Sequence, residues 1–200
     1  MIRSLSLAIL AVAITIPVFA QETQNNISVK TYGIDVELLG YGASFGGFYT
    51  IHPQPRFRLA AETDWVLVES DETFTFNYYY QPIQINNKNL SMLKFLLDAT
   101  YFPFIDSMDP SFQFGTFVSG GPVLAMDTAN EGGVVERWKD VQGYWSVLLR
   151  AGVHTRIRTS NGGIYFFRFG LDHSRFDTAL DGKQTYSGVF FQAGLELLHR

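Results

Sequence analysis

The sequence predicts an all-β protein, a closed antiparallel up-and-down transmembrane β-barrel of eight strands. Three observations predict it: apolar and polar residues alternate with a period of two, the composition is aromatic with few charges, and the chain starts with an export signal. Aromatic residues make up 16% of the chain and charged residues 17%, whereas soluble domains carry about 25% charged residues. This composition fits a protein whose outer wall does not face water.

The first residues have the pattern of a secretory signal peptide. Arg3 precedes an apolar run over 5–16, and Val18-Phe19-Ala20 places tolerated residues around a cleavage site. The run is shorter than the roughly 20 residues that a membrane-spanning helix needs. We therefore expect a signal peptide over 1–20 and a barrel domain over 21–200. An uncleaved N-terminal anchor is the alternative.

Cysteine usage and charge exclude several classes. The chain has no Cys, so neither a disulfide framework nor a lipid-attachment cysteine is expected. The net charge is −4, and the sequence has no Lys/Arg cluster of the kind that would indicate nucleic-acid binding. The sequence indicates no cofactor.

Alternation predicts the strands. Near the C-terminus, Val189, Phe191 and Leu195 share one strand face. Gln192 and Glu196 share the other. The same split predicts strands at 31–39, 43–51, 56–68, 89–102, 111–126, 143–158, 163–175 and 185–198.

The apolar faces are predicted to point outward. Bulky apolar side chains from eight strands would overfill the interior of a small barrel. The opposite faces combine glycine with charges of both signs, which suits a narrow interior of paired side chains. Aromatic residues near strand ends are typical of interfacial girdles, and those predicted to form them are Tyr32, Trp65, Tyr101, Tyr144, Trp145, Tyr165 and Tyr186. A soluble lipocalin-like barrel is the alternative.

The connections alternate in length. Short turns are predicted at 52–55, 103–110 and 159–162, and longer loops at 69–88, 127–142 and 176–184. Short periplasmic turns and long outer loops place both termini in the periplasm. The first outer connection, Gly40-Tyr41-Gly42, is unusually short. The alternative is one kinked strand over 31–51, with part of 73–86 supplying the missing strand.

The polar faces predict a charged interior. Its expected members are Asp35, Glu37, Arg58, Glu62, Asp64, Lys94, Asp98, Arg150, His154, Arg156, Arg168, Asp172 and Glu196. Because unpaired buried charges are costly, these groups should pair and plug a barrel that is just wide enough for its side chains. A narrow gated ion path is the alternative.

One segment, Asp172-His173-Ser174, has catalytic residue types. Neighbours on a strand point to opposite faces, so His173 and Ser174 are badly placed for acyl transfer. His52 and His199 have no metal-ligand spacing. We therefore expect no catalytic, cofactor-binding or metal-binding residues and no enzymatic activity.

Over 31–198 the chain resembles the OmpA/OmpX-like class of small outer-membrane barrels. The resemblance rests on the signal, the alternating segments, the Gly-containing strand 114–122 and the final strand 189–197. It implies an outer-membrane location, contact with outer-membrane lipid and insertion by the barrel-assembly machinery. The terminal Leu198-His199-Arg200 departs from the terminal aromatic residue of that class.

A resemblance to lipid A deacylase barrels would rest on His173-Ser174 alone. That family separates its His and Ser by one residue, whereas these two are adjacent, so the activity is not carried over. The leading hypothesis is a non-enzymatic cell-envelope barrel with a structural role, or one that binds an extracellular ligand through its outer loops. A membrane-embedded lipid-modifying enzyme and a narrow, porin-like channel are the alternatives.

Overall fold

The computed structural model describes most of the predicted barrel domain. The described residues are 29–69, 74–76, 82–84, 89–109, 111–128, 141–159 and 163–198. The predicted signal peptide 1–20, the start of the predicted domain over 21–28 and the tail 199–200 lie outside them. No helix in the described segments is long and apolar enough to span a bilayer.

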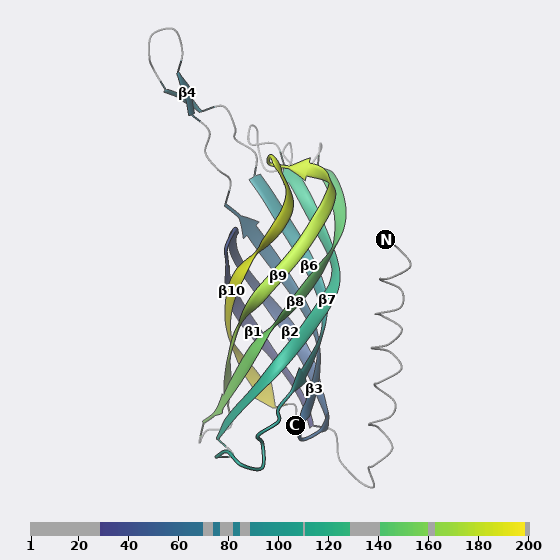
Figure 1. Ribbon diagram of the computed structural model, residues 1–200, viewed down its shortest axis with the longest axis vertical. Coiled ribbons are helices and arrows are strands. Elements are labelled where there is room, and N and C mark those ends of the chain that lie inside the picture. The colour runs from purple at the N-terminus through teal and green to yellow at the C-terminus, as the bar shows by residue number, and fades with distance from the viewer. Residues whose placement is uncertain are drawn as a thin grey trace.

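Eight strands form one closed antiparallel barrel, as predicted (Figure 1). They are β1 (Val29–Leu39), β2 (Gly42–Gln54), β3 (Phe57–Val68), β6 (Asn89–Tyr101), β7 (Phe112–Thr128), β8 (Gln142–Arg158), β9 (Ile164–Leu180) and β10 (Lys183–Leu198). Consecutive barrel strands pair, and β1 pairs with β10 to close the sheet. We call the end where β1 begins and β10 finishes the lower end, and the opposite end the upper end.

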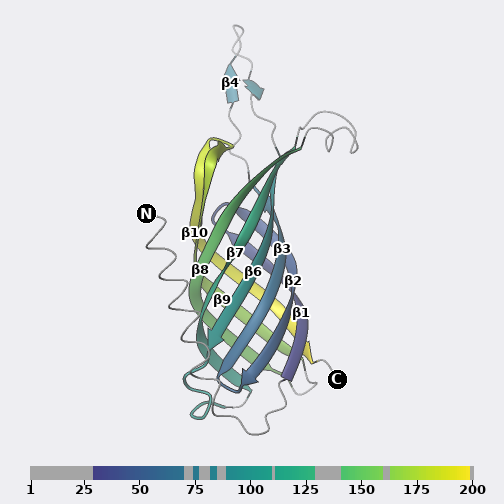
Figure 2. The same ribbon diagram turned by 90° about the vertical axis from the view of Figure 1, so that its right-hand side faces the viewer.

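The strands are staggered around the barrel. Pairing followed from Thr31 through each strand in turn returns to Gly188 on β10, whereas the direct partner of Thr31 is Leu198, ten residues away. A closed sheet with such a stagger has strands tilted by about 35–45° from its axis. The crossing of near and far strands in Figure 2 follows from this tilt.

The barrel wall is apolar outside and charged inside along most of its length. Leu97, Ile34 and Leu171 are 72%, 69% and 65% exposed, whereas Arg58 and Lys94 are fully buried. This is the reverse of a soluble barrel and matches a wall that faces lipid. We call this band of exposed apolar side chains, which includes Leu97, Ile34 and Leu171, the apolar belt. The predicted outward orientation of the apolar faces is confirmed.

The polarity reverses near the upper end. On β9, His173, Arg175 and Asp177 are exposed outside, while Phe176 and Leu180 are buried inside. The residues of this upper apolar core are Val66, Leu90, Met92, Leu96, Val123, Ala125, Leu148, Phe176, Leu180 and Tyr186. Above the apolar belt the barrel is therefore built like a soluble protein, because water rather than lipid surrounds it.

The girdle prediction is wrong for two residues. Tyr186 is only 2% exposed and donates a hydrogen bond to the Leu180 carbonyl (2.6 Å), and Tyr144 packs against the upper apolar core. Both lie where the strands have passed the belt, so an aromatic residue there fills the interior. The other predicted girdle residues, Tyr32, Trp65, Tyr101, Trp145 and Tyr165, are exposed or partly exposed.

Two connections differ from expectation. The chain turns between β1 and β2, so the alternative of one kinked strand over 31–51 is wrong. The predicted loop 176–184 is mostly strand, because β9 and β10 extend to a tight turn at Asp181-Gly182. Both turn residues have positive φ, at 48° and 75°, which suits a two-residue hairpin turn. The loop prediction failed because the outer face above the belt is polar and lacks the apolar alternation.

A second, small sheet lies beyond the upper end. Strand β4 (Phe74–Phe76) pairs antiparallel with β5 (Pro82–Gln84), and this hairpin projects away from the barrel (Figures 1 and 2). The rest of the predicted loop 69–88 beyond Glu69, and residues 129–140 of the predicted loop 127–142, lie outside the described residues.

At the lower end, the turn between β6 and β7 is fixed by local hydrogen bonds. The backbone amide and hydroxyl of Ser111 both donate to Oδ1 of Asp109, at 2.7 and 2.6 Å. These two donors hold the pKa of the exposed Asp109 carboxyl below its usual value.

The apolar belt gives a direct test of orientation. Leu97→Arg, in the middle of β6, should lower the free energy of unfolding in lipid vesicles by about 2–4 kcal/mol, because the charge enters hydrocarbon. Thr185→Arg, exposed above the belt, should change it by less than about 0.5 kcal/mol. Equal effects in urea-induced unfolding would contradict the assignment of the belt.

Candidate functional site

The candidate site is the lumen of the barrel. All the residues predicted to form the interior charge network are buried, namely Asp35, Glu37, Arg58, Glu62, Asp64, Lys94, Asp98, Arg150, His154, Arg156, Arg168, Asp172 and Glu196. They come from six strands, β1, β3, β6, β8, β9 and β10. Alternation points each of them inward, since each has the inward phase of its strand, and closure of the sheet brings them into one lumen.

The lower layer of the lumen is built on Glu196. Its carboxylate accepts hydrogen bonds from Arg156 Nη2 at 2.5 Å and from Arg58 Nε at 3.2 Å. Arg58 also donates from Nη1 to Asp98 Oδ1 at 2.9 Å. Two arginines from opposite parts of the sequence therefore share one carboxylate at the end of β10.

Arg168 forms the middle layer. Its guanidinium donates to Glu62 Oε1 at 2.6 Å and to Asp98 Oδ1 at 3.0 Å. Its Nε donates to Nδ1 of His154 at 3.1 Å. The accepting nitrogen must be unprotonated, so this contact places the His154 proton on Nε2. His154 is thereby a neutral member of the network.

The upper layer is centred on Glu37. Its carboxylate lies 2.9 Å from Lys94 Nζ and 2.6 Å from Arg150 Nη2, and Ser44 Oγ donates to it at 2.8 Å. Asp172 lies 3.8 Å from Arg150 and accepts a hydrogen bond from the Tyr41 hydroxyl. The ion pairs thus continue upward to the edge of the upper apolar core.

Aromatic rings separate these layers, and the charge prediction did not include them. The guanidinium carbon of Arg150 lies 4.5 Å from the ring centre of Phe190, and that of Arg168 lies 4.9 Å from the ring centre of Phe117. Buried cations over aromatic faces gain about 2 kcal/mol. The sequence feature that could have placed Phe190 in the interior is its position on the same strand face as Gln192.

Two of the predicted carboxylates form no ion pair with the described residues. Asp35 and Asp64 are 4% and 1% exposed, and both neighbour Gly46 in the strand register. Both oxygens of Asp64 lack a hydrogen-bond partner in the described parts of the chain. The pairing prediction is therefore wrong for these two.

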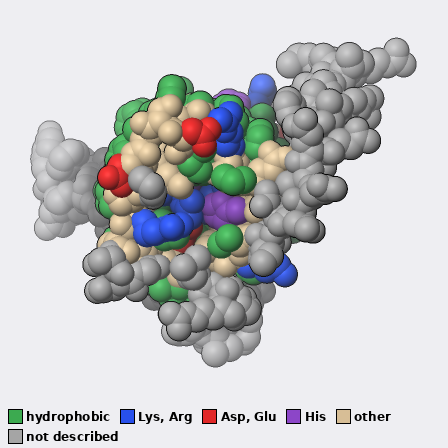
Figure 3. Space-filling view, turned by 90° about the horizontal axis from the view of Figure 1, so that it is seen from below, with side chains coloured by type: hydrophobic (Ala, Val, Ile, Leu, Met, Phe, Trp, Pro, Cys, Tyr) green, Lys and Arg blue, Asp and Glu red, His purple; other side chains and the backbone are tan. Residues whose placement is uncertain are grey.

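The two ends of the lumen differ. The upper apolar core lies inside the upper end. At the lower end, basic and histidine side chains lie at the centre of the opening (Figure 3). His52 lies in β2 rather than in the predicted turn, and its Nε2 is 3.5 Å from Arg156 Nη2.

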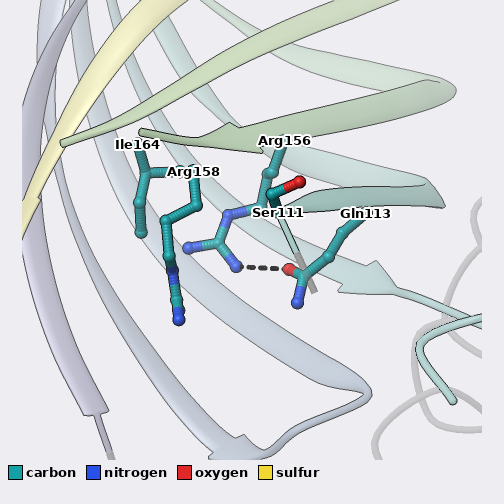
Figure 4. Close-up of a pocket in the computed structure, with 5 residues that line it drawn as sticks. All are labelled: Ser111, Gln113, Arg156, Arg158 and Ile164. Atoms are coloured by element: carbon teal, nitrogen blue, oxygen red, sulfur yellow. Dashed lines mark hydrogen bonds between the residues drawn. The ribbon is translucent and has the colours of Figure 1, made fainter. Parts of the chain in front are cut away.

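A small pocket lies at this lower end. Its lining is Ser111, Gln113, Arg156, Arg158 and Ile164 (Figure 4). Arg156 Nη1 donates across it to Gln113 Oε1 at 2.9 Å. The cavity volume is about 10 Å³, close to the minimum that holds one water molecule. The pocket is too small for a substrate or a cofactor.

The one segment with catalytic residue types is split between the two faces. Ser174 is buried and His173 is exposed. Instead, His173 Nδ1 lies 2.7 Å from the hydroxyl of Ser187 on the outer wall, across the β9–β10 pair. In the described residues, no group of three or more His, Asp or Glu side chains could hold a metal ion.

The barrel geometry agrees with that of a solved outer-membrane protein. Neisserial surface protein A is 12% identical, with a TM-score of 0.50 over 86% of this chain and 96% of that one. The chain has the fold of the small eight-stranded outer-membrane β-barrels.

Two further solved barrels are similar at lower scores. Ail of Yersinia pestis is 8% identical, with a TM-score of 0.46 over 85% of this chain and 97% of that one. The N-terminal barrel of Pseudomonas aeruginosa OprF is 14% identical, with a TM-score of 0.43 over 87% and 100%. No protein-family model and no curated protein sequence matches the chain.

The upper layer provides a test of the network. Glu37→Gln leaves Lys94 and Arg150 without their shared carboxylate, so it should lower the free energy of unfolding by about 3–5 kcal/mol. Asp106→Asn is the control, since its ion pair with Arg56 is exposed and should contribute little. Urea titration of the barrel in lipid vesicles measures both free energies of unfolding. An unchanged free energy of unfolding in Glu37→Gln would contradict the importance of this layer.

Proposed function

We propose that this protein is a non-enzymatic outer-membrane barrel whose interior is a structural plug and whose upper end binds an extracellular ligand. It would be exported by the signal peptide 1–20, which is cleaved, and inserted by the barrel-assembly machinery. The observation that carries the proposal is the content of the lumen, where ion-pair layers lie beneath an apolar core.

The outer-membrane location is supported by the wall. An apolar belt around a closed sheet satisfies the two demands of a bilayer, which are apolar contact and complete backbone hydrogen bonding. The described connections at the lower end are short, as periplasmic turns of such barrels are. The lower end would therefore face the periplasm.

The structural role of the interior is supported by its pairing and its volume. Each arginine of the three layers contacts at least one carboxylate within 4 Å. The pocket at the lower end has room for about one water molecule. An ion would have to break these pairs and then cross the upper apolar core, which argues against the narrow-channel alternative.

The binding role is supported by what stands on the upper rim. The β4–β5 hairpin extends away from the barrel (Figure 2), and residues 127–142 connect the long strands β7 and β8 on the same side. Loops on a rigid scaffold are common binding elements. The barrel would hold these segments outside the cell.

The topology can be tested with protease on intact cells. Cleavage is expected within 69–88 or 127–142, while the turn at 103–110 stays protected because it faces the periplasm. Mass spectrometry of the fragments gives the cut sites. Cleavage at 103–110 in intact cells, or recovery of the protein in a detergent-free periplasmic extract, would contradict the proposed location.

The plug is tested by conductance. The purified barrel in planar bilayers should give no current steps, because the ion pairs and the upper apolar core block the axis. A large porin in the same bilayer is the positive control. Regular, repeatable steps from the wild-type barrel would favour the channel alternative.

The contact between His173 and Ser187 supports a second candidate, a lipid-ester hydrolase at the upper edge of the belt. It would use Ser187 as nucleophile and His173 as base. No described acidic side chain contacts His173 to orient it. Lipid masses from cells with the wild type and with Ser187→Ala decide: identical spectra reject this candidate, and a deacylated lipid that requires Ser187 would replace the main proposal.

A further inference from the structure

The outer wall has an apolar groove where the first and last strands meet. Its volume is about 280 Å³, and the side chains that line it are Ile34, Val36, Tyr165, Phe167, Ala193 and Leu195. In the register, Ala193 on β10 lies directly between Val36 on β1 and Phe167 on β9. One small side chain between two larger ones forms the floor, and the neighbours form the walls.

One wall of this groove is held in place. The ring of Phe167 stacks on that of Phe191, with ring centres 6.2 Å apart. Stacking between neighbouring strands fixes the wall before any ligand arrives, which lowers the entropic cost of binding. The groove is therefore a preformed feature of the wall.

The size and lining of the groove indicate an acyl chain. Its volume lies near the lower limit of about 300 Å³ for small-molecule sites, so it fits a segment of one chain rather than a whole lipid. Hydrophobicity alone cannot select a lipid here, since the surrounding bilayer is equally apolar. Selection requires shape together with a polar contact at the headgroup.

Lys30 supplies a charge at the appropriate depth. It lies on the same outward face of β1 as Tyr32 and Ile34, and all three are exposed. Four residues at about 3.3 Å each separate Lys30 from Ile34 by roughly 13 Å along the strand, which is about 10 Å along the barrel axis at a strand tilt of about 35–45°. Half of the hydrocarbon core is about 15 Å, and a lysine side chain extends toward the nearest water, so the Lys30 ammonium can reach the headgroups of the lower leaflet.

We propose that this groove and Lys30 form a binding site for one phospholipid of the periplasmic leaflet. An acyl chain would lie along Ala193 between Val36 and Phe167, and the phosphate would contact the Lys30 ammonium. The site goes beyond the proposed function, since it concerns the seam of the barrel and no ligand of the upper rim.

The test uses the folded barrel in detergent micelles and native mass spectrometry with added phosphatidylglycerol. The wild type should retain one lipid more tightly than any further ones. Lys30→Gln should weaken this retention about fivefold, the effect of one basic residue near an anionic surface. Ala193→Phe should remove it by filling the floor of the groove.

Matched controls are available elsewhere on the outer wall, at positions that do not line the groove. Ala151 lies between Val118 and Leu171 on the outer wall, so Ala151→Phe makes the same change away from the groove. Arg175→Gln removes an exposed charge at the upper end. Both should retain the lipid as the wild type does. Heat-modifiable gel mobility confirms folding, and Ala193→Leu replaces Ala193→Phe if the latter does not fold.

Three outcomes would overturn the proposal: equal losses for Ala151→Phe and Ala193→Phe, unchanged retention in Lys30→Gln, or equally tight retention of diacylglycerol, which lacks the phosphate. Equal retention of phosphatidylethanolamine would support a phosphate contact without selection by net charge. Failure of the lipid-site proposal would not affect the proposed outer-membrane location, because protease accessibility and fractionation test that location separately.

Discussion

Backbone hydrogen bonding in a solvent that offers no partners is the constraint on which this structure depends. Each unpaired peptide group in hydrocarbon costs several kcal/mol, so a sheet in lipid must have no free edge. Pairing of β1 with β10 removes the last edge. Closure then fixes the stagger, the tilt and the width of the lumen, and with them which side chains meet inside.

The narrow lumen makes its charges interdependent. Glu37 serves both Lys94 and Arg150, and Glu196 serves both Arg58 and Arg156. Removing one carboxylate therefore takes an ion pair from two buried cations at once, and such a loss costs more than a single exposed pair contributes. Aromatic rings lie between the layers, in contact with the guanidinium groups of Arg150 and Arg168. The interior is in this sense a polar core, packed with ion pairs where a soluble protein has aliphatic side chains.

The outside of the barrel follows its surroundings along the axis. Where lipid surrounds the strands, the wall is apolar and the interior polar. Where β9 and β10 rise above the belt, Arg175 and Asp177 are exposed outside, and Phe176 and Tyr186 are buried inside. One continuous strand thus contributes an inward Arg168 and, eight residues later, an inward Phe176. The same alternation serves both environments with opposite polarity.

The sequence by itself determined the eight-stranded closed barrel and the inward set of charged residues, because a period of two assigns every residue to a face without any knowledge of its neighbours. It could not determine which carboxylate meets which cation, that Asp35 and Asp64 form no ion pair with the described residues, or that Tyr144 and Tyr186 turn inward. It also missed the contact between His173 and Ser187 and the groove at Ala193. Those features depend on the register between strands and on where the belt ends, and both are decided only when the sheet closes in three dimensions.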